Sequence, residues 1–412
     1  MLKSVEEKIW KQPLYPEFPR SEYDDRIGRV KKYMADEKLD ILVLWDVNNI
    51  RYFSGFRSVH WAPMTLQCAV LLIPVDKEPI IVVPDFFQGV VEGFTFLNQI
   101  RLLCEPHVTA HMRELPKLVA DTVKELGFGK GRIGIEGGLA GGMCWPRPIN
   151  DIDLFRSELN GANLVYAADV IWRCRTIKSP AEIDALWIAT VADVRAYGEL
   201  VANFELGWTE RDVGRFMRNK VLEFSEDCPP PLILASSRRV CMADVPAFDD
   251  EVSLSTGDRI ALEPYSIYKG YWGSCARSFH IGPIPDEALQ KSMAIDRSVD
   301  VAKEAVKPGI TSGRILEIIN EALAEKGYEN SLDMGGHGVG LNFQEPPAIA
   351  IGEEFIVEEG MILAIEAWAL DADDMSARKV PNLYGTEDYV VVTKDGSDPF
   401  PTFSKNIRCL GT

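Results

Sequence analysis

The sequence predicts a two-domain protein of the α/β (α+β) class. At 412 residues the chain is too long for one ordinary hydrophobic core. Helix-like and strand-like patterns alternate along its first part, and its second part repeats one order of elements: helix, turn, helix and then sheet. A composition of 46% hydrophobic and 26% charged residues is that of a globular chain. We expect one domain over residues 1–170 and a second over residues 171–412.

The first domain is predicted to be a small α/β domain with a mixed sheet. Short apolar runs predict its strands, at residues 40–45, 67–74, 79–84 and 132–136. Amphipathic patterns predict helices over residues 22–38 and 112–126, and Gly127 ends the second of them.

The junction between the domains is expected at residues 168–178. Directly after it, Ser179 can cap a helix, Pro180 suits the first helical position, and Glu182 completes a capping box. A long helix is therefore predicted to run from this point to about Phe204.

The second domain is predicted to contain a degenerate internal duplication. Each half has two helices joined by a turn, at residues 207–210 in the first half and 308–311 in the second. Strands follow each helix pair, at residues 232–235 and 258–264 and again at 361–367 and 389–393. Two similar αβ halves that face each other across a pocket are expected.

Charge and cysteine usage exclude several classes of function. A formal net charge of -18 argues against nucleic acid and anionic lipid as partners and favours a cationic or zwitterionic small molecule. The longest apolar runs are strand-sized and the N-terminus has no apolar leader, so neither a membrane span nor a signal peptide is expected. The eight scattered cysteines form no CxxC pair, which is typical of reduced thiols in a cytoplasmic protein.

Several short motifs occur in an order that points to one family. They are Asn49–Phe56, Arg175–Glu182, Gly270–Tyr271 with Arg277–Gly282, Gly336–Leu341, Gly360–Glu366 and Gly385–Asp388. Together they resemble the creatinase/prolidase/aminopeptidase P family, and the resemblance covers nearly the whole chain. It implies a creatinase-like N-terminal domain, a C-terminal pita-bread domain with pseudo-twofold αβ halves, and a homodimer with its active site near the subunit interface.

The resemblance also implies that a two-metal site has lost ligands. The family's peptidases hold two divalent ions with two Asp, one His and two Glu, and His337, Glu366 and Glu387 keep three of these positions. The two Asp positions hold Glu263 and Ser274. Since a serine hydroxyl is a poor ligand for a divalent ion, we expect no tight dinuclear site and no cofactor. A single, weaker ion on Glu263, His337, Glu366 and Glu387 remains an alternative.

Other departures from the peptidase pattern define candidate substrate-binding residues. The peptidases carry a His shortly before Glu-x-Pro, where this chain has residues 343–346, and another upstream, where the nearest titratable group here is Asp244. Ser274 is expected to donate a hydrogen bond to the substrate rather than to act as a nucleophile. Tyr265 is a candidate for stacking on a flat or cationic substrate, whereas we expect Tyr268 and Trp272 to be core or dimer contacts. By resemblance, His60 and Trp61 reach the partner subunit's pocket.

The catalytic candidates are His337, Glu263, Glu366 and Glu387. The glycines around His337 allow close backbone approach, so we favour an acid/base role over a purely structural one. Glu263 is a nucleophile or acid/base by resemblance to ectoine hydrolase; the competing interpretation is a structural carboxylate paired with Arg277. Cys275 is expected to be a buried thiol that points the other way on its strand.

The leading functional hypothesis is a metal-independent hydrolase that cleaves a C–N bond in a small amidine, guanidino or amide-like compound. Three carboxylates around one histidine repel one another unless some are protonated or a cation neutralises them, and creatinase and ectoine hydrolase are metal-free relatives that act on such molecules. The first alternative is a divergent metal-dependent Xaa-Pro aminopeptidase or prolidase. Further alternatives on the same fold are a lyase and a non-catalytic peptide-binding module.

Overall fold

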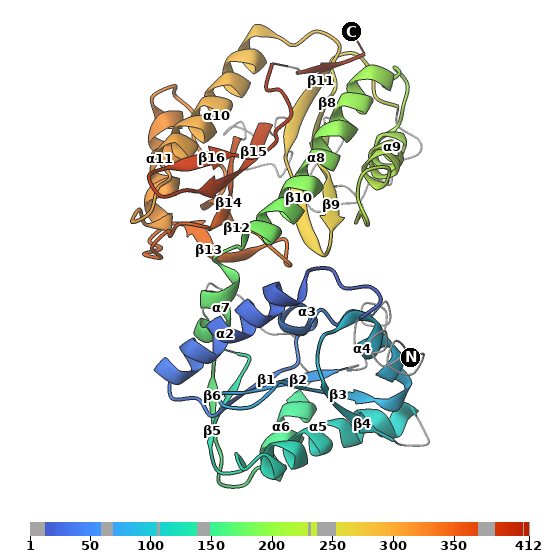
Figure 1. Ribbon diagram of the computed structural model, residues 1–412. Coiled ribbons are helices and arrows are strands. Elements are labelled where there is room, and N and C mark those ends of the chain that lie inside the picture. Colours follow the sequence, from blue (N-terminus) through green and yellow to red (C-terminus); the bar gives the residue numbers. More distant parts are fainter. Residues whose placement is uncertain are drawn as a thin grey trace. The chain divides into compact units, whose positions relative to one another are not determined.

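The computed structural model describes residues 13–58, 69–104, 108–137, 149–229, 232–236, 253–369, 384–406 and 408–411. The chain divides into two compact units, Met1–Arg175 and Thr176–Thr412 (Figure 1). Within the described ranges, no helix has the length and apolar character needed to cross a bilayer.

The first unit contains a mixed sheet, as the sequence predicts. Its strands are β1 (Ile41–Leu44), β2 (Val70–Pro74), β3 (Ile80–Pro84), β4 (Gln99–Leu103), β5 (Arg132–Ile135) and β6 (Asn163–Tyr166). They lie in the order β4-β3-β2-β1-β5-β6, and β2 runs antiparallel to both neighbours while the other pairs are parallel. The helical segments are α2 (Arg20–Asp36), α3 (Val47–Ser54), η1 (Asp85–Phe87), α4 (Gln88–Phe94), α5 (Val108–Glu125), α6 (Ile149–Glu158) and α7 (Ala168–Arg175).

A buried carboxyl group, that of Glu136, lies in this unit. It follows β5 and accepts hydrogen bonds from the backbone N–H of Trp45 at 2.7 Å and from Nδ2 of Asn49 at 2.6 Å. Burial, reinforced by the nearby charge of Asp46, raises the pKa of Glu136 to about 8. The side chain thus joins the end of β1 to the first turn of α3.

We expect the Glu136→Ala variant to lose about 2–3 kcal/mol of unfolding free energy, because buried donors of Trp45 and Asn49 would lose their acceptor. Urea denaturation measures this change. Glu125→Ala is the matched control, since it removes only an exposed ion pair with Arg101 and should cost less than about 1 kcal/mol. Equal losses in the two variants would contradict the role given to Glu136.

The second unit has a long sheet flanked by two helix pairs. The helices are α8 (Pro180–Asn203), α9 (Glu210–Leu222), α10 (Asp286–Ala305) and α11 (Ser312–Ala324). The strands are β7 (Leu232–Ser236), β8 (Arg259–Glu263), β9 (Tyr265–Tyr268), β10 (Tyr271–Ser274), β11 (Arg277–Ile281), β12 (Met334–Gly338), β13 (Glu345–Ala350), β14 (Ile362–Ala369), β15 (Tyr384–Val392), β16 (Ser397–Pro399) and β17 (Cys409–Leu410). The main path is β13-β12-β14-β15-β11-β8-β7, and β9 and β10 form a separate hairpin.

The predicted duplication is visible in how the two helix pairs begin their second helices. Thr209 caps α9 and Thr311 caps α11, each by accepting a backbone hydrogen bond through its side chain. Each of these threonines also forms an isolated antiparallel bridge, to Ser253 and Ile356 respectively. The predicted capping box of Ser179 and Glu182 opens α8. The same local device therefore recurs in both halves of the unit.

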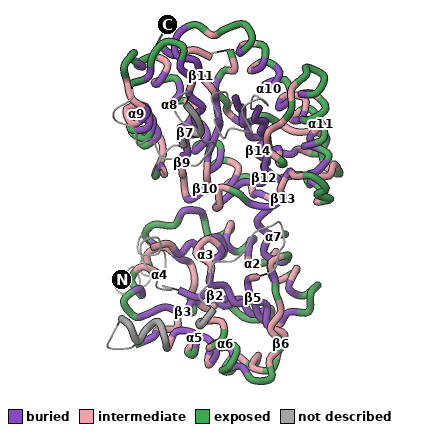
Figure 2. The backbone as a smooth tube through the Cα atoms, turned by 180° about the vertical axis from the view of Figure 1, so that it is seen from behind, coloured by how far each residue is buried: buried purple, intermediate pink, exposed green. Residues whose placement is uncertain are grey.

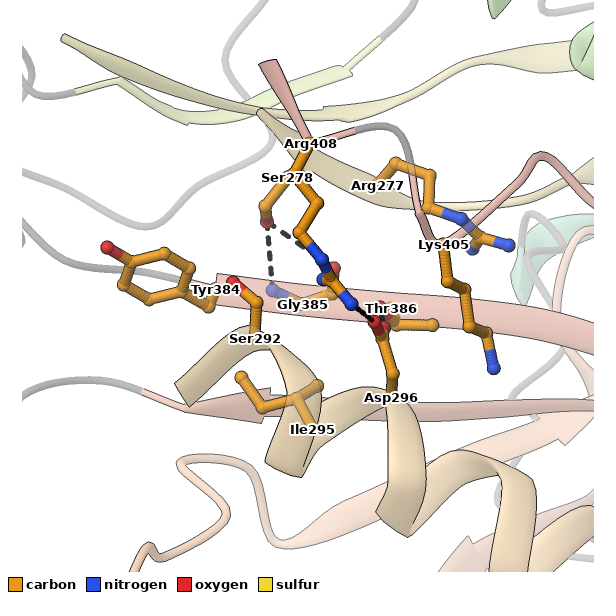
Figure 3. Close-up of a pocket in the computed structure, with 10 residues that line it drawn as sticks. All are labelled: Arg277, Ser278, Ser292, Ile295, Asp296, Tyr384, Gly385, Thr386, Lys405 and Arg408. Carbon is orange, nitrogen blue, oxygen red and sulfur yellow. Dashed lines mark hydrogen bonds and ion pairs between the residues drawn. The ribbon is translucent and has the colours of Figure 1, made fainter. Parts of the chain in front are cut away.

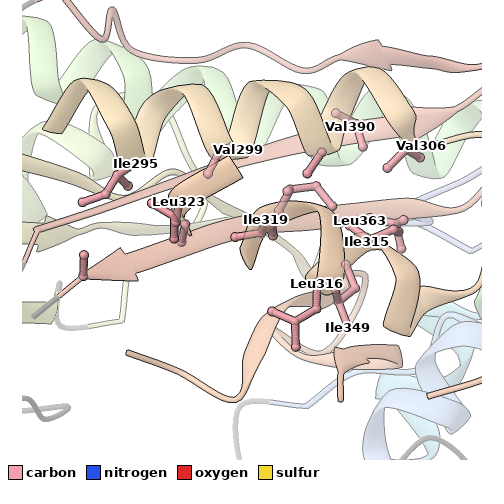
Figure 4. Close-up of a cluster of buried hydrophobic side chains, with 14 of the residues drawn as sticks. Ile295, Val299, Val306, Ile315, Leu316, Ile319, Leu323, Ile349, Leu363 and Val390 are labelled. Atoms are coloured by element: carbon pink, nitrogen blue, oxygen red, sulfur yellow. The ribbon is translucent and has the colours of Figure 1, made fainter. Parts of the chain in front are cut away.

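Each helix pair covers its own part of the sheet (Figures 1 and 2). In the second half, Val299 of α10 and Ile319 of α11 join Leu363 of β14 and Val390 of β15 in one buried cluster (Figure 4). In the first half, Tyr197 of α8 donates its hydroxyl hydrogen to the carbonyl oxygen of Leu262, at 2.7 Å. These contacts fix β8, β14 and β15, which hold the candidate catalytic carboxylates.

Two local predictions were wrong. β15 begins at Tyr384 rather than at residue 389, because its polar first half pairs residue for residue with β14 as far as Ala369. Cys275 is a buried thiol, as expected, but it lies in the break between β10 and β11 and not within a strand. Because Cys275 lies outside the strands, the alternation of side chains along a strand does not determine which way its thiol points.

Candidate active site

Three of the candidate residues meet at the ends of β8 and β10, beside β15. Glu263 is the last residue of β8 and Ser274 the last of β10, and Glu387 lies on β15. The Ser274 hydroxyl donates a hydrogen bond to Oε2 of Glu387 at 2.7 Å and lies 3.5 Å from Oε1 of Glu263. All three side chains are buried. Ser274 therefore lies between the two carboxyl groups.

The remaining catalytic candidates come from the other half of the unit. Glu366 on β14 is directly opposite Glu387 in the antiparallel register. His337 on β12 is opposite Ala364, two residues before Glu366 on the same strand. The charge of Glu366 acts on the pKa of His337, and it also acts on that of Glu387. The predicted four residues thus form one electrostatically connected group.

Two glycines fix the backbone on either side of His337. A side-chain carbon added at Gly336 would collide with the carbonyl oxygen of Ala364, and one added at Gly338 would collide with that of Pro346. Gly336 also has a φ of 129°, which disfavours any other residue. The close backbone approach predicted from the glycine pattern is confirmed.

The imidazole of His337 has a defined proton position. Its Nδ1 lies 2.9 Å from the carbonyl oxygen of Gly338, which can only accept, so Nδ1 bears a hydrogen, and in the neutral imidazole Nε2 bears none. Burial lowers the pKa of His337, and the charge of Glu366 opposes this effect. A neutral imidazole with a basic Nε2 is suited to accept a proton.

Glu387 differs from an ordinary glutamate. Burial raises its pKa well above the usual value, and the charges of Glu263 and Glu366 raise it further. Its Oε1 atom is buried without a hydrogen-bond partner in the described part of the chain, while Oε2 accepts from Ser274. A hydrogen on Oε1 would leave Oε2 free to accept from Ser274 and would make Glu387 a potential proton donor.

The donor set does not fit a pair of divalent ions. The residue between Glu263 and Glu387 is a neutral hydroxyl whose hydrogen is directed to a carboxyl oxygen. Across the ranges that the structure describes, no three His, Cys, Asp or Glu side chains are placed to hold a metal ion together.

Aromatic rings border the group on one side. Tyr265 pairs with Ser274 in the β9–β10 hairpin, and its ring centroid lies 4.7 Å from that of Phe343. Phe343 in turn presents its ring to His337 at 5.1 Å and to Trp272 at 6.0 Å. Phe343 was not a candidate from the sequence, although its segment was noted for lacking the peptidases' histidine.

Further polar neighbours were also missed. Nζ of Lys178 and Oε2 of Glu345 form a buried ion pair at 3.4 Å. The charge of Glu345 acts to raise the pKa of His337. Trp368 donates its indole N–H to Oε2 of Glu366 at 2.7 Å. In the sequence, only the family motif around Lys178 and the two-residue spacing from Glu366 to Trp368 pointed to these contacts. The substrate-binding candidates His60, Trp61 and Asp244 lie outside the described residues.

The alternative interpretation of Glu263 as a partner of Arg277 is wrong. Nη2 of Arg277 forms its ion pair with Asp388, at 2.6 Å, and Nη1 donates to the backbone carbonyl of Glu387 at 2.9 Å. Lys303 also pairs with Asp388 at 2.7 Å, and these cations hold the pKa of Asp388 well below its usual range. Arg277 thus fixes the strand that carries Glu387.

Asp388→Asn is expected to lower the unfolding free energy by about 3–5 kcal/mol at pH 7, because Arg277 would remain buried without its anionic partner. Since the folded-state pKa of Asp388 is depressed, its contribution is present above about pH 4, the usual unfolded value, and is lost as pH falls below it. The variant should therefore show a smaller acid-induced loss of stability. Denaturation curves from pH 2 to 7 test this, with exposed Asp398→Asn as the control.

A polar cavity lies beside β15 (Figure 3). Its lining includes Tyr384 and Thr386, which alternate with Glu387 along the strand. Arg408, which also lines it, pairs with Asp296 at 2.6 Å. Its charged lining residues, Arg277, Asp296, Lys405 and Arg408, all form internal ion pairs, and none of the catalytic candidates lines it.

Comparison with known proteins gives matches over most of the chain. The profile described as "Creatinase/Prolidase N-terminal domain" matches residues 26–177, and "Metallopeptidase family M24" matches residues 184–394. The "Probable dipeptidase PepE" of Mycobacterium tuberculosis is 26% identical over 387 residues, which cover 92% of this chain and 94% of that protein. The "Ectoine hydrolase" of Halomonas elongata is 21% identical over 379 residues, covering 86% and 92%. The crystal structure of dipeptidase PepE from Mycobacterium ulcerans superposes with a TM-score of 0.80 at 22% identity, covering 96% of this chain and 99% of that one.

Proposed function

The chain belongs to metallopeptidase family M24, and from this premise we propose that it hydrolyses a C–N bond in a small cationic or zwitterionic compound without a metal ion. Membership of this family confirms the predicted creatinase/prolidase resemblance and the fold class. It also identifies the protein as a hydrolase that acts on C–N bonds. Metal independence, the substrate class and the roles of individual residues belong to the proposal.

The single observation that supports metal independence most is the position of Ser274. A hydroxyl that donates to Glu387 at 2.7 Å, and lies 3.5 Å from Glu263, relieves repulsion between two carboxyl groups without an ion. The high pKa of Glu387 has the same effect, because a protonated carboxyl carries no charge. The Ser274 hydroxyl and a proton on Glu387 would therefore offset repulsion that a metal ion would otherwise offset.

The proposed reaction uses His337 as base and Glu387 as acid. As water attacks the substrate carbon, Nε2 of His337 takes the water proton and the new C–O bond forms. The C–N bond then breaks as the leaving nitrogen takes the proton of Glu387. Transfer of the proton from His337 back to Glu387 restores both groups. Glu366 stabilises the imidazolium, consistent with its upward effect on the pKa of His337.

We propose that Glu263 binds the positively charged group of the substrate. It ends β8 beside Ser274 and is buried, so a cationic nitrogen placed against it would be shielded from water. Amidinium and guanidinium groups match this charge, and Tyr265, whose ring meets that of Phe343 edge to face, is a candidate to stack on them. A direct attack by Glu263 on the same carbon is the other path open to this geometry.

The proposal is tested by a substrate panel. Purified protein is incubated with cyclic amidines, guanidino acids, betaines and Xaa-Pro dipeptides, and release of amine is measured. We expect turnover of an amidine or guanidino compound that is lost in His337→Ala. Turnover of dipeptides alone would contradict the proposed substrate class.

The second candidate is a divergent metal-dependent dipeptidase. It is favoured by the PepE dipeptidases among the relatives and by the presence of His337, Glu366 and Glu387 together. Elemental analysis separates the two candidates, because this alternative requires about two tightly held ions per chain.

Two predictions about the cellular form of the protein stay part of the proposal. They are a cytoplasmic location and a homodimer in which His60 and Trp61 approach the partner's active site. Light scattering on the purified protein determines the oligomeric state, and a monomer would contradict the second prediction.

A further inference from the structure

We infer that Trp368 is a positioning residue that holds the carboxylate of Glu366 toward His337 by donating its indole N–H. This inference rests on the proposed function, because that function gives Glu366 its role beside His337. It follows from the contacts of one buried tryptophan.

Trp368 is buried, and its indole N–H and both of its backbone polar groups form hydrogen bonds. It is 4% exposed, and Nε1 lies 2.7 Å from Oε2 of Glu366, two residues earlier on β14. Its backbone N–H lies 3.2 Å from Oδ1 of Asn330, and its carbonyl accepts from the N–H of Ser331 at 2.7 Å. These two bonds fix the backbone at Trp368, while burial and the bond to Glu366 restrict the indole itself.

Gly385 provides the space for the indole. It is the direct cross-strand partner of Trp368, and a side-chain carbon added there would overlap Cε3, Cζ3 and Cδ2 of the ring. The indole therefore lies against the bare backbone of β15, beside Glu387. Any larger residue at 385 would displace the ring that donates to Glu366.

The site needs such a donor because its carboxyl groups crowd one another. Side chains directly opposite in an antiparallel pair have Cβ atoms about 5 Å apart, which is the relation of Glu366 to Glu387. Ser274 binds Oε2 of Glu387 and Trp368 binds Oε2 of Glu366, so a neutral donor holds each of them. Without the indole, repulsion and solvation would turn the Glu366 carboxylate out of position.

The first test needs no substrate. Protein labelled with ¹⁵N in its nine tryptophan indoles should give one N–H resonance for each, and Trp368→Phe identifies the one that disappears. We expect this resonance to exchange slowly with solvent and to shift in Glu366→Gln, whereas an indole resonance lost in Trp187→Phe, which is 44% exposed, should not respond. An unchanged Trp368 resonance in Glu366→Gln would overturn the inference.

The second test uses the panel compound that is turned over fastest. Trp368→Phe should lower kcat about 10²-fold with KM changed less than about 3-fold, because a misplaced group acts on the transition state. Gly385→Ala should lower kcat in the unaltered protein but have no further effect in Trp368→Ala. Additive effects would show that Gly385 acts independently of the indole and would contradict the inference. If no compound is turned over, the proposed function fails while the resonance test still decides the role of Trp368.

Discussion

The Ser274→Asp variant is expected to gain tight binding of divalent metal ions and to lose stability when they are absent. Position 274 is completely buried, within hydrogen-bond reach of Glu387 and 3.5 Å from Glu263. A further carboxylate there would have no counter-charge, and a buried unpaired charge costs several kcal/mol. A divalent ion would supply that charge.

Thermal unfolding with and without manganese measures both effects. We expect the melting temperature of Ser274→Asp to lie well below that of the unaltered protein in chelator and to rise on addition of Mn²⁺, since an ion that binds only the folded state stabilises it. Ser274→Asn controls for size, because it adds no charge and should show no response. An equally large response of the unaltered protein would contradict the account, because Ser274 would then not prevent metal binding.

The Glu387→Gln variant is expected to be nearly inactive and yet more stable at alkaline pH. In the proposed reaction Glu387 supplies the proton to the leaving nitrogen, so its loss should lower kcat by about 10²–10⁴-fold. The amide keeps an acceptor for Ser274 but has no ionisable proton. Activity and stability thus change in opposite directions.

The sign of the stability change follows from the raised pKa of Glu387. Above about pH 4.3, the usual value, the unfolded chain releases this proton while the folded protein keeps it, so stability falls by about 1.4 kcal/mol for each pH unit until the folded pKa is passed. Glu387→Gln lacks this slope, so the difference in unfolding free energy should shift in favour of the variant as pH rises above about 4.3, until the folded-state pKa is passed.

Denaturation curves at several pH values test this, with Glu359→Gln as the exposed control. The raised pKa of Glu136 gives the unaltered protein and both variants a similar slope, so the difference between them isolates Glu387. A difference that does not change with pH would contradict a protonated Glu387.

Local patterns predicted the architecture of the second unit well. The capping box at Ser179 and the turns before Thr209 and Thr311 depend on neighbours in sequence, so their signals survive without tertiary information. The start of β15 was misplaced because its polar residues are stabilised by distant partners such as Arg277, which no local pattern shows.

The candidate site likewise combines features that local motifs predict with contacts that only the folded structure shows. His337, Glu263, Glu366 and Glu387 were located through motifs, and the structure brings them into one group. The contact of Trp368 with Glu366 depends on a strand register and on the absence of a side chain at Gly385, which become evident only when β14 and β15 are paired. Motifs therefore locate the candidate groups, while packing determines what holds them.

The measurement that tests the central claim most directly is the activity of metal-depleted protein. The protein is exhaustively treated with chelator, its metal content is determined by elemental analysis, and turnover of the best panel compound is measured before and after Mn²⁺ or Zn²⁺ is added. We expect well below one ion per chain with unchanged kcat. The reason is that the Ser274 hydroxyl and a proton on Glu387 offset the repulsion between the carboxyl groups. Activity that disappears on chelation and returns with the metal would contradict the account.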